Sequence, residues 1–302
     1  MYDGSQTRRK TLVASRCFTE VSQIYSIIAC SMPDIINTTI NRQLFTAYEG
    51  HNLLGKVYKV IVSVAPGSML VSAFGDSKEF LTAAGYTSTG LYGELFEEQI
   101  LSERLLNDNA KVAALFLATP KGMVVPKALY KEEAAEEWFR NTFFVEKGET
   151  VATYPLDDDK AVYVFAIPAE IKDLAERFFP KAKILPFAAH LLNKNYKSGN
   201  VLQCTITPKL AFATLYKAKA LLWHQVFDYT NAEDIAYKLR AACVQKGIED
   251  AILKCAADSS ELNPVLDALR SYYPEMQTGG ELADESWKAT VNLAQQLYPC
   301  AL

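Results

Sequence analysis

The chain has 302 residues, enough for two domains, and half of these residues are hydrophobic, which allows a sizeable core. Its 31 basic and 35 acidic residues give a net charge of −4, and no run of Lys and Arg alternates with aromatic residues, so we expect no nucleic-acid partner. No stretch reaches the roughly 18 apolar residues that a membrane-spanning helix needs, so we expect no transmembrane segment.

The N-terminal segment, residues 1–55, shows no clear pattern, and we predict that it is an extension of uncertain order. The basic run at residues 8–10 precedes an apolar stretch that ends at Cys30, which resembles the signal of a bacterial lipoprotein. Arg16 and Glu20 interrupt this stretch, whereas a signal needs it to be continuous. Anchoring through a lipid on Cys30 is therefore the alternative to our first expectation, a cytoplasmic location.

The spacing of cysteines and histidines predicts no metal or redox site, because no CxxC pair occurs and the histidines lie far from the cysteines. Cysteines within apolar patterns are typical core residues of proteins from a reducing compartment. We expect His190 and His224 to be packed or surface residues without a catalytic role. The residues concerned are Cys17, Cys30, Cys204, Cys243, Cys255, Cys300, His51, His190 and His224.

In the first half of the chain, the pair Pro66-Gly67 between two apolar runs predicts a hairpin with a tight turn. A third strand is expected near Tyr86. Apolar residues at helical spacing then alternate with apolar runs of strand length. We predict a hairpin (56–65 and 69–74), a helix (91–105), a strand (111–118), a turn (122–126), a helix (131–140), a strand (161–168) and a helix (169–179).

In the second half, three short runs predict an antiparallel meander of strands. A capping box from Thr230 to Glu233 opens a helix, in which Ile235 and Leu239 share one face. The predicted order is three strands (200–207, 210–217 and 221–227), this helix, a buried strand (251–257), a helix with Pro264 in its first turn (260–270), a short strand (275–278), and a last helix with Trp287, Val291, Ala294 and Leu297.

The same order therefore occurs twice: hairpin, helix, strand, helix, strand, helix. The two hairpin turns fall at Pro66 and Pro208. Strands that alternate with helices predict an α/β protein, with mixed sheets flanked by helices. We predict two tandem domains of this kind, over residues 56–194 and 195–302.

A duplicated unit of this kind resembles the ribonuclease-H-like fold, and two such units in tandem resemble the actin-like ATPase superfamily. More closely, the chain resembles an uncharacterised bacterial family, a domain of unknown function with an actin-like ATPase fold. The resemblance implies the fold and no established activity. It rests on GMVVPKALY (122–130), VYVFAIP (162–168), FPKAKILP (179–186) and FDYTNAEDIAY (227–237).

The resemblance directs attention to the first hairpin turn, which in actin-like ATPases resembles D-x-G-[ST] and approaches a phosphate with its backbone N–H groups. Gly67 and Ser68 fit this pattern, but Ala65 replaces the aspartate that serves the magnesium ion, and Pro66 has no N–H. The equivalent second turn, residues 206–209, has neither Asp nor Gly. Without a carboxylate for Mg²⁺, little offsets the charge on a leaving phosphate. We therefore expect no ATP hydrolysis by the family mechanism.

Gly279 and Gly280 precede the last helix, roughly where the superfamily places a Gly-Gly turn against adenosine. A helix N-terminus at this place could receive an anion, although an ordinary loop explains the pair equally well. Gly67, Ser68, Gly279 and Gly280 are therefore the candidate nucleotide-binding residues. The candidate cofactor is Mg-ATP, against the first expectation that no cofactor binds.

The other acidic groups indicate solvated surface. Residues 157–159 are three adjacent aspartates in an extended segment, where neighbouring side chains do not converge on one metal ion. The predicted helix over 131–140 presents a row of acids on its wet face, namely Glu132, Glu133, Glu136 and Glu137.

We expect a cytoplasmic, non-catalytic protein that binds or scaffolds a protein partner, by analogy with the pilus- and secretion-assembly members of the superfamily. The alternative is a nucleotide-binding or ATP-hydrolysing protein with a non-standard site. That site would take its carboxylates from elsewhere, such as Asp76 or Asp228 near strand ends.

Overall fold

The structure, a computed structural model, describes residues 41–47, 51–88, 92–156, 160–194, 196, 198–279 and 286–302. Cys17, Cys30 and the lipoprotein-like stretch lie outside the described residues, as do Gly280 and the aspartates at 157–159. All elements named below belong to the unit Thr39–Leu302. In the part of the chain that is described, no helix is long and apolar enough to cross a bilayer.

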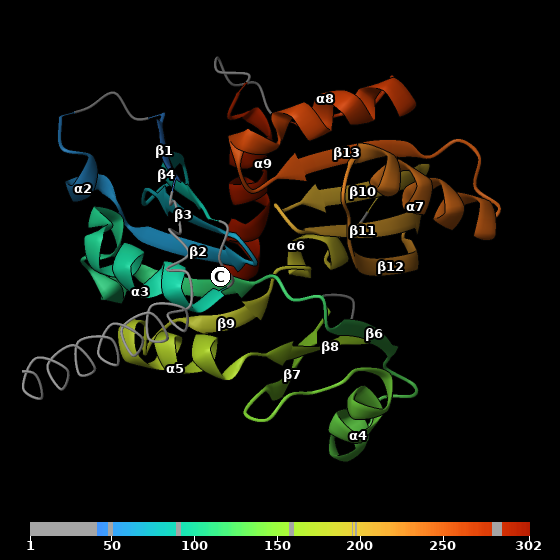
Figure 1. Cartoon of the computed structure of the whole chain (residues 1–302), viewed down its shortest axis with the longest axis horizontal. Helices are drawn as coiled ribbons and strands as arrows, with labels where there is room; N and C mark the ends of the chain where they lie inside the picture. Colours follow the sequence, from blue (N-terminus) through green and yellow to red (C-terminus); the bar gives the residue numbers. More distant parts are fainter. Residues whose placement is uncertain are drawn as a thin grey trace, which may run out of the picture. The chain divides into compact units, whose positions relative to one another are not determined.

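The first sheet has the strand order β1-β4-β3-β2-β5-β9 (Figure 1). β2 pairs antiparallel with β3, β3 pairs antiparallel with β4, and β5 runs parallel to both β2 and β9. The predicted hairpin and the third strand around Tyr86 are confirmed. The strands are β1 (Asn41–Thr46), β2 (Lys59–Ala65), β3 (Ser68–Phe74), β4 (Phe80–Thr87), β5 (Val112–Leu117) and β9 (Lys183–Pro186).

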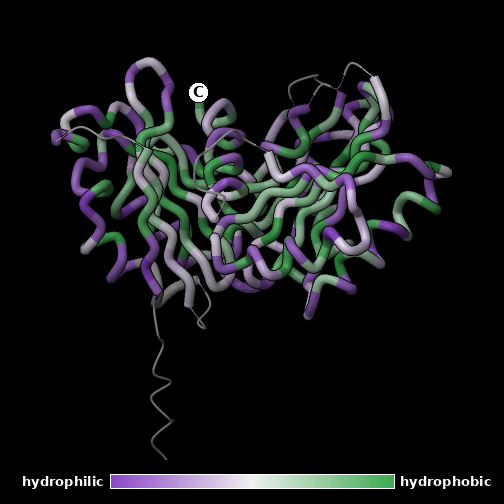
Figure 2. Tube along the Cα trace, turned by 90° about the horizontal axis from the view of Figure 1, so that it is seen from above, coloured by the Kyte–Doolittle hydropathy of each residue, from purple (hydrophilic) through white to green (hydrophobic). Residues whose placement is uncertain are grey.

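Almost every residue of β2 and β3 is buried, which fits their continuous apolar sequences, since elements cover both faces of the sheet. Figure 2 shows hydrophobic segments gathered within the sheets and strongly hydrophilic segments at the periphery. The helix α5 buries Ile171 and Leu174 against this core. The helical elements of this half are α2 (Leu53–Lys56), α3 (Tyr92–Ser102), η1 (Arg104–Leu106), η2 (Asn109–Lys111), α5 (Ala169–Phe178) and α6 (Ala189–Leu192).

β1 and α2 come from the segment that we predicted as an extension. β1 pairs antiparallel along β4, so the first sheet begins before residue 56, where the predicted first domain begins. The sequence of β1, NRQLFT, is mostly polar and exposed, as is typical of an edge strand. A polar edge strand has little hydrophobic pattern, which explains why it was not predicted.

The predicted strand at 161–168 is present as β8 (Ala161–Ile167), but its predicted place in the repeated unit is wrong. β8 is the middle strand of a separate antiparallel sheet with the order β6-β8-β7, and β9 takes its place in the first sheet. Tyr163 and Phe165 of β8 join the main core, whereas Val162 and Val164 pack with Phe139 of the helix α4. Because both faces of β8 are buried, its sequence looks like that of a central parallel strand.

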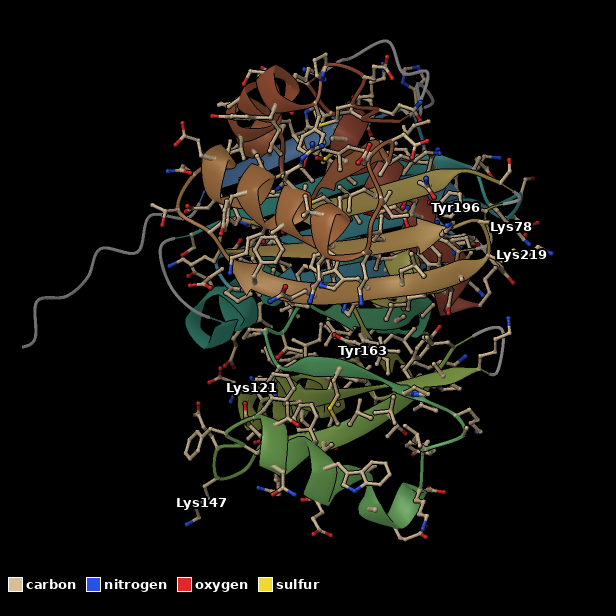
Figure 3. The ribbon with its side chains drawn as sticks, turned by 90° about the vertical axis from the view of Figure 1, so that its right-hand side faces the viewer. Lys78, Lys121, Lys147, Tyr163, Tyr196 and Lys219 are labelled. Atoms are coloured by element: carbon tan, nitrogen blue, oxygen red, sulfur yellow. The ribbon has the colours of Figure 1, made fainter. Side chains whose placement is uncertain are left out.

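This inserted sheet lies against the second half of the molecule, where the ring of Tyr163 meets His224 of β12 edge to face at 5.4 Å (Figure 3). Residues 122–126, predicted as a turn, form its edge strand β6. The predicted helix over 131–140 is confirmed as α4, and its glutamates are exposed. The bounds are β6 (Gly122–Pro126), α4 (Glu132–Thr142) and β7 (Thr150–Pro155).

The second sheet repeats the pattern of the first, with the order β12-β11-β10-β13. β10 and β11 form the antiparallel hairpin, and β13 runs parallel to β10. The short strand predicted at 275–278 is a single parallel bridge between Lys254 and Gln277. The elements are β10 (Asn200–Ile206), β11 (Leu210–Lys217), β12 (Ala220–Asp228), α7 (Ala232–Gln245), β13 (Ile252–Ala257), η3 (Ser260–Leu262) and α8 (Asn263–Tyr272).

The helix α7 begins one residue later than its predicted capping box. Its N-cap is Asn231, whose side chain accepts a hydrogen bond from the N–H of Asp234 at 3.0 Å. The carboxylate of Asp234 in turn accepts from the N–H of Thr230 at 2.9 Å. Asn231 therefore takes the capping role that was predicted for Thr230, and Asp234 accepts from the residue that precedes the cap.

The last helix, α9 (Lys288–Leu297), joins the two halves because it contacts both β13 and β4. Its predicted apolar face is confirmed, since Val291, Ala294 and Leu297 are fully buried. Trp287 at its N-cap stacks on Phe45 of β1 with ring centroids 5.6 Å apart. The chain ends in η4 (Tyr298–Ala301).

One hydrophobic core extends from the first sheet into the second half. Leu210 and Phe212 of β11 belong to the same cluster as the strands of the first sheet and α9. Phe212 meets Phe187, which follows β9, with ring centroids 4.9 Å apart. The two halves are therefore held together by apolar packing as well as by chain connection.

Candidate functional site at the hairpin turns

The first turn has the geometry of a type II β-turn, with Pro66 at its second position and Gly67 at φ 83° in its third. Ser88 donates its N–H to the carbonyl of Gly67 at 2.9 Å. A Cβ atom on residue 67 would lie 3.1 Å from the carbonyl oxygen of Ser88. The positive φ of residue 67 and the nearby carbonyl of Ser88 therefore require glycine at this position, whether or not a phosphate binds there.

The second turn is closed without glycine. Thr207 donates its N–H to the carbonyl of Leu210 at 2.8 Å, and the Thr207 hydroxyl accepts from the N–H of Leu210 at 3.1 Å. Tyr229 adds a hydrogen bond from its hydroxyl to the carbonyl of Thr207 at 2.7 Å. These contacts fix the hairpin and leave Pro208 and Lys209 at its tip.

The tips of the two turns lie close together. A Cβ atom added to Gly67 would lie 3.7 Å from Cβ of Pro208 and 3.7 Å from Cε of Lys209, so one more methyl-sized group would bring the two turns into van der Waals contact.

Asp258, which the sequence analysis did not single out, lies beside the first turn. It directly follows β13, and its backbone N–H donates to the carbonyl of Ile206 at 3.1 Å. Its carboxylate accepts a hydrogen bond from the hydroxyl of Ser68. Carboxyl ends of parallel strands meet at one edge of a sheet, so an acid directly after a buried strand was a signal that could have found it.

The carboxyl group of Asp258 is only 3% exposed. Burial raises its pKa to about 7, although the hydrogen bonds from Ser68 and from its own backbone N–H oppose this rise. Among the described residues, its second oxygen, Oδ1, has no hydrogen-bond partner. A buried carboxyl group that is partly protonated at neutral pH is a poor magnesium ligand, because magnesium favours ionised and hydrated oxygen ligands.

The segment that follows Asp258, here called the clasp loop (residues 258–261), continues the contact with the first sheet. Glu261 accepts hydrogen bonds from the side chains of Asn41 at 2.6 Å, Gln43 at 3.3 Å and Thr87 at 2.7 Å. The hydroxyl of Ser260 donates to the side-chain oxygen of Gln43. The clasp loop thus ties the second half to β1, β3 and β4 on the same side as the first turn.

His190 and His224 are packed, which is one of the two arrangements expected from the sequence. His190 is 1% exposed, and burial lowers its pKa to about 3, so the ring is neutral. Its Nδ1–H donates to the carbonyl of Phe187 at 2.6 Å, and Nε2 accepts from the hydroxyl of Thr205 at 2.8 Å. Burial also lowers the pKa of His224, to about 4. Both rings serve packing between elements.

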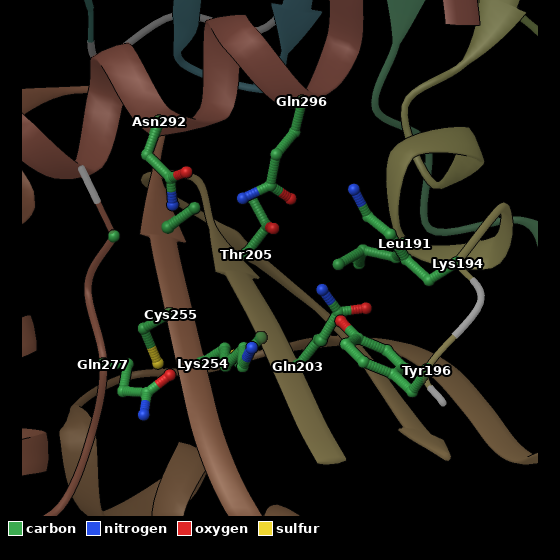
Figure 4. A pocket seen from close by; sticks show the side chains of 13 residues that line it. Leu191, Lys194, Tyr196, Gln203, Thr205, Lys254, Cys255, Gln277, Asn292 and Gln296 are labelled. Carbon is green, nitrogen blue, oxygen red and sulfur yellow. The ribbon is translucent and has the colours of Figure 1, made fainter. Parts of the chain in front are cut away.

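Gly279 lies at φ 77° and lines a cavity of about 320 Å³ between the second sheet and α9 (Figure 4). That cavity includes neither Gly67 nor Ser68 among its lining residues. A Cβ atom on Gly279 would overlap the side chain of Asn292 at 2.3 Å. The structure therefore brings Ser68 together with Asp258, and it places Gly279 in a different cavity.

The two carboxylates that were predicted for a non-standard nucleotide site, Asp76 and Asp228, lie in different parts of the molecule. Asp228 pairs with Leu210, so it lies at the end of β12 that is next to the second turn, where it is exposed. Asp76 follows the far end of β3, about 20 Å along the strand from Ser68 at about 3.3 Å per residue. Asp76 is therefore too far from Ser68 to share a metal ion with it. Among the described residues, no cluster of three or more metal-binding side chains occurs.

Comparisons with known proteins agree with this architecture. Residues 43–275 match the family described as "Protein of unknown function (DUF3822)". A solved structure from Bacteroides thetaiotaomicron, a protein with actin-like ATPase fold and unknown function, is 14% identical with a TM-score of 0.61, covering 82% of this chain and 98% of that chain. A chain of the PilM–PilN type IV pilus biogenesis complex is 12% identical with a TM-score of 0.53, covering 82% and 99%. No protein of curated function matched the sequence.

Proposed function

Because the chain belongs to the family described as Protein of unknown function (DUF3822) and has the actin-like ATPase fold that its sequence predicted, we propose that it is a non-catalytic binding or scaffolding module of that fold. The module binds a protein partner in the cytoplasm, and it binds neither a cofactor nor nucleic acid.

The observation that carries the proposal is the arrangement of the two hairpin turns. Pro208 and Lys209 lie close to Gly67, and the hydroxyl of Ser68 already has a protein partner in Asp258. Ala65 supplies no carboxylate for Mg²⁺. Because phosphoryl transfer depends on positioning and on charge stabilisation by metal and donors, these features support a non-catalytic role.

Two features support a protein partner. The solved chain with a TM-score of 0.53 belongs to a pilus biogenesis complex, which is an argument by analogy of fold. In the inserted region (residues 122–167), Leu129 is 63% exposed, and Phe144, at 81%, is the most exposed large apolar side chain among the described residues. We propose that the partner binds at this inserted region.

The test is affinity capture from an extract of the native cells with the full chain as bait. A protein captured by the wild type should be lost with Phe144→Ser and retained with Tyr237→Ser, a matched control that changes a 73% exposed aromatic residue on α7. Equal capture by all three proteins would show that Phe144 does not belong to the partner-binding surface. ATP hydrolysis by the purified wild type, abolished in Ser68→Ala, would contradict the proposal as a whole.

A second candidate function, a nucleotide-binding or ATP-hydrolysing protein with a non-standard site, rests on Asp258. Its carboxyl group lies at the first turn, and its Oδ1 has no partner among the described residues. An opening of the halves that broke the bond to Ser68 would hydrate and ionise this group, which could then hold Mg²⁺ through water. This candidate requires that Asp258→Ala abolish Mg-ATP binding.

A further inference from the structure

A polar cavity of about 320 Å³ lies between the second sheet, α9 and the segment that follows α6, away from the two turns. Its side chains come from β10, β13 and α9, and Figure 4 shows Gln203, Lys254, Asn292 and Gln296 converging on it with Lys194. A sheet face that packs against a helix is normally apolar, since such faces form the core of a domain. This face carries charged and amide groups instead.

The strand register explains how these groups come together. Gln203 of β10 pairs with Lys254 of β13 in parallel register, so both side chains lie on one face of the sheet. The alternate residues Cys204 and Cys255 belong to the apolar cluster that packs with α7 and α8. The polar residues thus occupy only the face towards α9, where Asn292 and Gln296 lie one turn apart.

The described lining of the cavity carries positive charge. Lys194 and Lys254 both line it, and the lining described contains no Asp or Glu. Neither ammonium group forms an ion pair with another described residue, and that of Lys254 lies 5.4 Å from the centre of the Tyr196 ring. Burial lowers the pKa of Lys194, and the neighbouring Lys254 lowers it further, whereas Cys300 opposes this. Positive groups in a recess without a counter-ion favour a bound anion.

A second observation concerns Gln203. It is 4% exposed, and its Oε1 has no hydrogen-bond partner among the described residues. A buried acceptor without a partner is unfavourable, so a ligand that donates to it would be favoured. The ligand that matches the cavity therefore combines anionic oxygens with at least one O–H group.

The volume indicates the size of this ligand. Water occupies about 30 Å³ per molecule in the liquid, so 320 Å³ corresponds to roughly ten water molecules. A small molecule with a similar number of non-hydrogen atoms therefore matches the cavity. We propose that this cavity binds a small hydroxylated oxyanion, a phosphate ester or a hydroxycarboxylate, held by Lys194 and Lys254 with donation to Gln203.

The test measures binding by the full chain with glycerol 3-phosphate and malate as the two probes, and with neutral glycerol as the uncharged comparison. At least one anionic probe should raise the melting temperature, beyond the effect of sodium chloride at equal ionic strength, while glycerol should not. The stronger of the two probes identifies the class of anion. Mg-ATP should not displace it.

Lys254→Gln and Lys194→Gln should each weaken the binding of that probe by about tenfold or more in a calorimetric titration, since each removes a charge-assisted contact. Lys246→Gln, which removes an exposed lysine after α7, is the matched control and should bind as the wild type does. Two independent variants guard against the failure of one to fold. The proposal is overturned if neither anion shifts the melting temperature, or if both cavity variants bind as tightly as the control.

Discussion

Among the described residues, Asp258 is the one residue of the second half whose side chain is hydrogen-bonded to Ser68 of the first turn. Its position makes the contact between the halves sensitive to protonation. The folded-state pKa of about 7 lies above the ordinary value of 3.8, because burial disfavours the ionised form. The folded protein therefore binds this proton more tightly than the unfolded chain does.

The sign of the pH dependence follows. Stability from this group is fully present below about pH 4 and is lost as the pH rises through 7. Asp258→Asn keeps the shape of the side chain and remains neutral at every pH. Relative to the wild type, the variant should gain roughly 3 kcal/mol in unfolding free energy between about pH 5 and 8. Urea denaturation of both proteins at the two pH values measures this difference, in which the contributions of His190 and His224 cancel.

Ser68→Ala is the matched control, because it removes the donor and keeps the carboxyl group. Since the bond from Ser68 lowers the pKa of Asp258, its loss should raise that pKa further and extend the pH dependence upwards. Parallel curves for the wild type and Asp258→Asn across this range would contradict a buried and protonated carboxyl group.

At the scale of elements, α9 couples the two halves through one core. Leu297 is fully buried in the cluster that includes strands of the first sheet and β11. Leu297→Ala should lower the unfolding free energy by roughly 2–5 kcal/mol, as expected for a large-to-small change in a core. Unfolding should remain a single transition, because a continuous core makes the halves cooperative.

Denaturation followed by fluorescence and by circular dichroism checks this expectation, with Gln295→Ala on the exposed face of α9 as the control. The control should unfold as the wild type does. Two separate transitions in Leu297→Ala, or no loss of stability, would contradict the coupling of the halves through α9.

The elements with strong periodic patterns were predictable from the sequence, whereas those defined by tertiary pairing were not. The strands of the second half have clear apolar patterns. The helix α8 has a clear apolar period and a proline in its first turn. The predicted strand at 161–168 was given the place that β9 occupies because β8, with the longer apolar run, belongs to the inserted sheet. β1 escaped prediction because an exposed edge strand has almost no hydrophobic alternation.

At the scale of the whole molecule, the same division applies to the candidate site. Gly67 and Ser68 could be found from the sequence because a turn is a local feature. The bond from Ser68 to Asp258 spans 190 positions, so no local pattern contains it. The short distance between the tips of the two turns likewise depends on how the halves pack, which no local sequence pattern determines.

The central proposal is that the two hairpin turns, which lie close together and lack a carboxylate at residue 65, do not bind a magnesium-bound triphosphate. The most direct measurement is the melting temperature of the full chain over a titration with Mg-ATP, since a ligand that binds the native state raises it progressively as the ligand concentration exceeds the dissociation constant. The account predicts a melting temperature that does not change up to millimolar Mg-ATP. A rise that grows with the nucleotide concentration and disappears in Asp258→Ala would contradict it.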